Sequence, residues 1–166
     1  MKFALLLTIV MLLAFSAIAG VKVDHVADAD FESYRTYAWK RGAEAARPEV
    51  QQWVVQAVER ELEARGLRKV VDRRADLYVV TYAYAEMNSR IRSNYVHLDV
   101  YDVGVLTSDA VLTTKGVLAI DLIDGESDLP VWRGVASEVM GDPSLEKVHK
   151  KIDKLTRKMF KDFPPR

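Results

Sequence analysis

Four carboxylates crowd one short stretch of the chain, "DLIDGESDLPVWRG" at residues 121–134: Asp121, Asp124, Glu126 and Asp128. Carboxylates at alternate positions are typical of a calcium loop, and Asp124, Glu126 and Asp128 match its positions one, three and five. Such a loop also needs Gly at position six and a carboxylate at position twelve. This chain has Leu129 and Val135 there, which argues against a calcium site.

The same stretch fits a β-hairpin. The segments that flank it alternate between apolar and polar residues, and the residues between them are rich in turn formers. We therefore predict that the carboxylates solvate a hairpin loop, so that replacing Asp124 and Asp128 by Ala changes stability by no more than about 0.5 kcal/mol. Trp132 would pack on the sheet as a core residue. Arg133 would lie on the opposite face, where Asp121 is a possible cross-strand partner.

Motifs of the common enzyme classes are absent from the sequence. The closest glycines, Gly134 and Gly141, are seven residues apart, which leaves neither G-x-S-x-G nor G-x-G-x-x-G. No Gly precedes a Lys and no His precedes a Glu, so P-loop and H-E-x-x-H motifs are also missing. The chain contains no Cys, and so no thiol nucleophile and no Cys-based zinc site. We therefore expect a protein that is not an enzyme, with no catalytic residues and no cofactor.

The three histidines fall in three different predicted elements: His25, His97 and His149. His97 and Asp99 share one face of a predicted strand, but two ligands are too few for a protein metal site. His149 lies among lysines, where a solvated side chain is the simpler interpretation. The sequence thus predicts no metal site.

The N-terminus has the pattern of a secretory signal peptide over residues 1–19. Lys2 gives a short positive region, an unbroken apolar run follows, and Ala17 and Ala19 occupy the positions that a signal peptidase reads. We predict cleavage before Gly20 and a periplasmic or secreted protein. The alternative is an uncleaved membrane anchor, for which the run is short, since a spanning helix needs about 20 apolar residues. After cleavage we expect no membrane span.

Charge is unevenly distributed along the predicted mature chain. It holds 23 Lys and Arg against 24 Asp and Glu, a net charge near −1 that does not favour nucleic-acid binding. Residues 146–166, however, contain eight basic and three acidic side chains. The candidate surface-binding residues are the lysines of this predicted helix: Lys147, Lys150, Lys151, Lys154 and Lys158. They are either an ordinary solvated helix face or a contact for an anionic envelope surface such as lipid headgroups.

Hydrophobic periodicity predicts one α+β domain over residues 20–166. Apolar residues at helical spacing indicate helices over 47–67 and 142–163, the second with Asp142 as N-cap and Pro143 as its first residue. An extended entry and a short strand at 28–40 precede the first helix. Four more strands are predicted between the helices, at 75–86, 93–104, 114–124 and 130–140. The order β-α-β-β-β-β-α implies a mainly antiparallel sheet of about four to five strands with two helices on one face.

Several short segments together resemble a known family. They are "DFESYRTYAW", "LEARGL" leading into "ADLYVVTYAY", "GVLAIDLID", "VWRGVAS" and the closing "FPP". In this order they are similar to the bacterial envelope family known as domain of unknown function 4136. The resemblance implies a small, lipoprotein-like α+β domain exported by Gram-negative bacteria, with no established activity and no catalytic residues to carry over. This chain lacks the Cys that bears the lipid in the common pattern.

Two hypotheses of function follow. The first is a non-catalytic envelope domain that binds another envelope protein or an anionic surface, with exposed tyrosines such as Tyr95 and Tyr101 as contacts. The second is a binder of a small apolar or lipid-like ligand between sheet and helices. Its cleft would be lined by Trp39, Trp53, Tyr82 and Trp132, which are otherwise ordinary core. A hydrolase that uses scattered carboxylates is the outside alternative.

Overall fold

The computed structural model describes residues 20–71, 74–98, 103–141 and 144–165, and within these it describes no side chains at 88 and 90–112. Its elements follow in the order β1 (Val21–His25), β2 (Thr36–Trp39), α1 (Pro48–Glu63), β3 (Arg68–Lys69), β4 (Leu77–Leu98), β5 (Val103–Asp124), β6 (Pro130–Met140) and α2 (Leu145–Met159). The predicted α+β class is confirmed. The predicted order lacked β1 and the two-residue β3.

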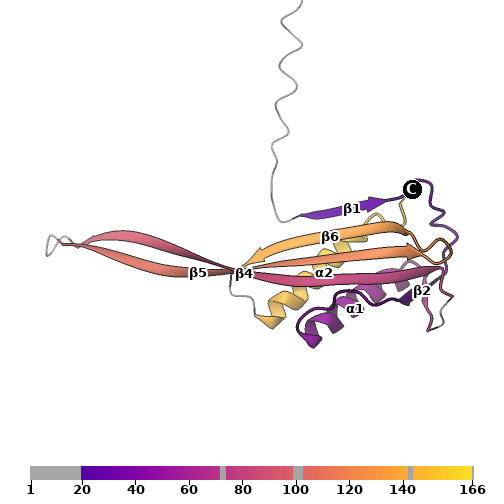
Figure 1. Cartoon of the computed structure of the whole chain (residues 1–166), viewed down its shortest axis with the longest axis horizontal. Coiled ribbons are helices and arrows are strands. Elements are labelled where there is room, and N and C mark those ends of the chain that lie inside the picture. Colours follow the sequence, from indigo (N-terminus) through magenta and orange to yellow (C-terminus); the bar gives the residue numbers. More distant parts are fainter. Residues whose placement is uncertain (1–19, 72–73, 99–102, 142–143, 166) are drawn as a thin grey trace, which may run out of the picture.

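The strands form one mixed, open sheet in the order β1-β6-β5-β4-β2-β3. The β1–β6, β6–β5 and β5–β4 pairs are antiparallel, whereas β2 runs parallel to both β4 and β3. The two helices lie along the same face of this sheet (Figure 1). The prediction of a mainly antiparallel sheet covered on one face is therefore confirmed, with six strands in place of four to five.

Helix α1 lies within the predicted range 47–67, and its two ends carry the residues that favour a helix start and stop. Pro48 occupies the first turn, where its missing N–H costs nothing, and Glu49 adds a negative charge at the positive end of the helix. The helix stops before Gly66, whose φ of 86° suits a residue without a Cβ. Its buried side chains recur at helical spacing: Val54, Ala57, Val58 and Leu62.

Helix α2 begins two residues later than predicted. Ser144 is its N-cap, and the Ser144 hydroxyl accepts a hydrogen bond from the Lys147 N–H. Asp142 and Pro143, which we expected to start the helix, lie outside the described residues. Among the apolar residues at helical spacing that predicted this helix, Ile152 and Met159 are buried. Leu145, by contrast, is 40% exposed.

Strands β4 and β5 extend far beyond the body of the molecule. Strand β6 pairs with β5 only as far as Thr114↔Met140, while β4 and β5 continue to pair to Leu98↔Val103 (Figure 1). The two separate strands predicted at 75–86 and 93–104 are therefore wrong. The second is split between the end of β4 and the beginning of β5, and residues 87–92, which lie between the two predicted strands, are part of strand β4. We call the two-stranded part, residues 88–98 and 103–113, the ribbon.

The core lies between the sheet and the helices and contains an aromatic cluster at its centre. Trp132 is 2% exposed and stacks on Phe160, with a ring-centroid distance of 4.7 Å. Its six-membered ring lies close to Gly134, where a Cβ would come within 2.6 Å of the indole. The prediction that Trp132 is a core residue is confirmed.

Candidate functional site

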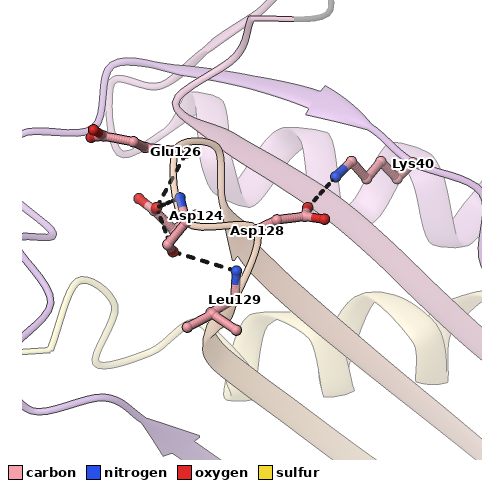
Figure 2. A network of polar contacts seen from close by, with 6 residues as sticks. Lys40, Asp124, Glu126, Asp128 and Leu129 are labelled. Atoms are coloured by element: carbon pink, nitrogen blue, oxygen red, sulfur yellow. Dashed lines mark hydrogen bonds and ion pairs between the residues drawn. The ribbon is translucent and has the colours of Figure 1, made fainter.

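The carboxylate-rich stretch is the turn of the β5–β6 hairpin (Figure 2). The Asp124 carboxylate organises it: one oxygen accepts hydrogen bonds from the N–H groups of Glu126 and Ser127 and from the Ser127 hydroxyl. The other oxygen accepts from the Tyr34 hydroxyl at 2.9 Å. The hydrogen bonds from Ser127, foremost among several donors, lower the pKa of Asp124. Burial, followed by the bond to Asp124, raises the pKa of Tyr34 to about 12.

The remaining residues of the turn have ordinary structural roles. Gly125 passes so close to the neighbouring backbone that a Cβ would lie 2.0 Å from the Ala75 carbonyl oxygen. Asp128 has a positive φ of 59°, and its carboxylate pairs with Lys40. Glu126 is exposed. The predicted hairpin is confirmed, but the expectation that these carboxylates only solvate the loop is wrong for Asp124, which is half-buried and holds the turn together.

Asp121 lies outside the turn, on the face of the sheet that the helices leave open. It is only 5% exposed and accepts two hydrogen bonds from the Arg133 guanidinium, at 2.6 and 2.7 Å. These bonds, followed by the attraction of the charge on Asp121, raise the pKa of Arg133. The predicted cross-strand partnership is confirmed. Because both groups are fully engaged with each other, the pair is structural.

The two histidines whose side chains are described, His25 and His149, do not share a metal site. His149 stacks on Trp53 at a centroid distance of 4.7 Å and lies 4.0 Å from Asp153. His25 is exposed on β1. The side chains of His97 and Asp99 lie outside the described residues. Across the described ranges, no three His, Cys, Asp or Glu side chains gather into a group that could hold an ion.

The four aromatic residues expected around an apolar cleft are not brought together. Trp132 is inside the core, and Trp39 donates its indole N–H to Glu59. Trp53 packs against His149, while Tyr82 lies on the opposite, helix-free face, paired with Ala119. None of the four lines either of the two hollows described below. Trp132, Trp39 and Trp53 therefore have structural roles in the core or at the helices, and Tyr82 belongs to the open face of the sheet.

The basic helix α2 does border a hollow, of about 460 Å³. We call it the lysine hollow; the end of β6 forms one wall and α2 the other. Its lining residues are Glu138, Val139, Met140, Gly141, Lys147, Lys150, Lys151 and Lys154. Four of the five lysines singled out in the sequence thus meet at one place, and Lys158 stays outside. The wall from β6 was missed, because no sequence pattern reveals which strand end lies beside a helix.

The charges of the lysine hollow are only partly compensated. Lys151 pairs with Glu138 at 2.5 Å, and Lys150 pairs with Glu146 at 2.6 Å, with both side chains of the latter pair 75% exposed. An ion pair so exposed contributes little and breaks readily. Lys147 and Lys154 have no ion-pair partner within the part of the chain that the structure describes. Four lysines therefore face one glutamate across the hollow.

A second hollow, of about 310 Å³, lies at the other end of the helices. Arg65, one of its lining residues, is already engaged. Its guanidinium pairs with Glu61 and donates to the backbone carbonyls of Phe160 and Phe163. Arg65 therefore ties the end of α2 to α1 and has a structural role in this hollow.

These features define a class: a small α+β domain with a mixed open sheet, two helices on one face, and a lysine-lined hollow beside one of them. The chain belongs to the family described as domain of unknown function, DUF4136, whose model matches residues 21–165. The resemblance seen in the sequence is thereby confirmed. No curated protein matches the chain.

Solved structures share the fold at low sequence identity. A DUF4136 family protein from Bacteroides thetaiotaomicron is 12% identical with a TM-score of 0.55, and the match covers 87% of this chain and 95% of that one. The PelC dodecamer from Paraburkholderia phytofirmans is 13% identical with a TM-score of 0.54, covering 89% and 99%. A PDZ domain protein from Parabacteroides distasonis is 15% identical with a TM-score of 0.59, covering 88% of this chain but only 35% of that longer one.

None of the helices that the structure describes has the length and apolar character needed to cross a bilayer.

Proposed function

We propose that this chain is an exported, non-catalytic domain of the bacterial cell envelope that binds an anionic surface through the lysine hollow. Export is supported by the signal-peptide pattern of residues 1–19. The observation that carries the binding proposal is the convergence of Lys147, Lys150, Lys151 and Lys154 on one hollow. The residues after position 19 have a net charge near −1, so this local positive charge is not a consequence of the overall composition.

The electrostatics favour an extended anionic surface over a single small anion. Lysine presents a compact, mobile point charge, which suits a field of phosphate or carboxylate groups more than a fixed bidentate contact. Each basic residue near an anionic bilayer contributes about 1 kcal/mol, and this attraction falls off within a Debye length, about 8 Å at physiological ionic strength. Binding through the hollow is therefore expected to weaken as salt is added.

A pair of matched variants tests this proposal. Lys147→Glu/Lys154→Glu reverses the two unpaired charges of the hollow, and Lys158→Glu/Lys161→Glu makes the same charge change on α2 or just after it, outside the hollow. In co-sedimentation with vesicles that contain phosphatidylglycerol, we expect the first variant to lose affinity by roughly thirtyfold or more. The second should lose much less. Equal losses would show a general charge effect, and unchanged binding in the first variant would refute the proposal.

A further inference from the structure

Strand β5 has a long outer edge in the ribbon that no described strand covers. Strand β6 pairs with β5 only as far as Thr114, while β5 continues from there to Val103 with β4 as its partner on the other side (Figure 1). The backbone N–H and C=O groups along such an edge are a template for pairing with another strand. An isolated two-stranded hairpin is only marginally stable in water, and a third strand adds to its stability.

The two edges of the main sheet have features that oppose pairing, and this edge of the ribbon has few of them. Edge strand β1 is only five residues long and contains Lys22 and Asp24. The other edge strand, β3, consists of Arg68 and Lys69 alone. Short length and charged residues both prevent an edge from pairing with another chain. Along residues 104–112 of β5, by contrast, the sequence GVLTSDAVL contains a single charged residue.

The sequence of this edge is complementary to itself in one antiparallel register. With Ser108 opposite Ser108 of a second copy, the one charged residue, Asp109, falls opposite the polar Thr107, and Val105 falls opposite Val111. Moving the two-fold axis by one residue in either direction puts Asp109 opposite Val105 or opposite Asp109 of the second copy. Like charges directly opposite each other destabilise a strand pair. The register centred on Ser108 is therefore favoured.

We propose that two copies of this chain pair through the β5 edges of their ribbons, antiparallel and centred on Ser108, to form one four-stranded ribbon. A two-fold interface uses the same surface on both copies, and the self-complementary register of residues 104–112 meets this requirement. The pairing gives each ribbon the additional strands that a two-stranded hairpin lacks in water. This proposal does not depend on the lysine hollow.

A disulfide cross-link tests the register. The chain contains no Cys, so Ser108→Cys and Ser93→Cys each supply a single thiol. Ser93 pairs with Ser108 within the ribbon and is the matched control on β4. Opposite residues of an antiparallel pair have Cα atoms about 4.5–5.5 Å apart, within the reach of a disulfide, whereas residues 93 of the two copies would be three strand spacings, about 14 Å, apart. Under mild oxidation we expect a covalent dimer from Ser108→Cys and none from Ser93→Cys.

Charge substitutions at the same two positions measure the association itself. In sedimentation equilibrium of the protein that starts at Gly20, we expect wild type to form a dimer. Ser108→Lys should weaken the dimer by about tenfold or more, because it places like charges opposite each other across the two-fold axis. Ser93→Lys should leave the affinity close to that of wild type. An equal mixture of Ser108→Lys and Ser108→Asp should dimerise again, since opposite charges then face each other.

Three results would overturn the proposal. The first is a wild-type protein that remains monomeric, and the second is a dimer that Ser108→Lys and Ser93→Lys weaken equally. The third is a dimer in which Ser93→Cys cross-links as readily as Ser108→Cys. Circular dichroism of each variant shows that it is folded, so that a loss of dimer is read as a loss of the interface.

Discussion

At the scale of single residues, Trp132 is a buried aromatic side chain of the core. The indole is buried between Phe160, Phe163 and the backbone at Gly134. We expect Trp132→Ala to lower the free energy of unfolding by roughly 3–5 kcal/mol, because a large cavity opens in a close-packed cluster. Urea denaturation followed by circular dichroism measures this. A loss below about 1 kcal/mol would mean that the indole is not packed as described.

Asp124 should matter more than its neighbours in the turn. Its carboxylate accepts hydrogen bonds from Ser127, Glu126 and Tyr34, and a hydrogen bond to a charged group contributes about 1.5–3 kcal/mol. Asp124→Ala is therefore expected to cost roughly that much, whereas Glu126→Ala, at an exposed position, should stay within about 0.5 kcal/mol. Thermal unfolding of the two variants, compared at equal pH, checks the difference. If both substitutions lowered the stability equally, Asp124 would be only a solvated loop residue.

Asp76 should make the stability of the protein depend on pH in the acidic range. Burial alone would raise its pKa, but hydrogen bonds from the Arg35 N–H, the Thr36 hydroxyl and the Thr36 N–H outweigh burial and hold it below the ordinary 3.8. A carboxyl whose pKa is lowered by folding stabilises the protein above its unfolded pKa, and this stability is lost as the pH falls through the folded value. Stability should therefore decline below about pH 4.

Asp76→Asn isolates this contribution, since the amide cannot ionise. We expect the variant to be less stable than wild type at pH 7, with a gap that narrows as the pH falls from 4 to 2. The measurement is a series of urea titrations across this range. A constant gap would show that the carboxylate's charge is irrelevant to its hydrogen bonds.

At the scale of elements, the ribbon stands apart from the body. Among the side chains that are described, the core cluster and the residues packed against it extend along β4 no further than Ala83. On β5 the core cluster ends at Leu118. Replacing residues 89–112 by an Asn-Gly turn should therefore leave the melting temperature within about 4 °C of wild type, a change of about 1 kcal/mol for a domain of this size. A larger loss would show that the ribbon supports the sheet.

The elements also show how far the sequence could lead. Helix α1, the β5–β6 hairpin and the Asp121–Arg133 pair were predictable, because each depends on local periodicity or on neighbouring strands. The ribbon was not, since its polar stretches look like loops when the partner strand is unknown. The hollow was half predictable: its lysines follow helical spacing, but Glu138 and Val139 reach them only through the tertiary fold.

At the scale of the whole molecule, the prediction concerns processing of the N-terminal segment. Export should remove residues 1–19, so that the mature protein starts at Gly20. Intact-mass measurement of the exported protein checks this. Because no Cys is present to receive a lipid, globomycin, which blocks lipoprotein maturation, should leave processing unchanged. A protein that still began at Met1 would refute cleavage.

The pairing of β1 with β6 has a consequence for the order of events during export. On the proposed export, strand β1 would be the first strand to cross the membrane, yet its partner is the last strand, more than one hundred residues later. Such a long-range pairing forms slowly, because the intervening chain must be ordered first. We therefore expect that, during the proposed export, β1 would stay without its sheet partner until β6 had crossed, so that this edge of the sheet closes late.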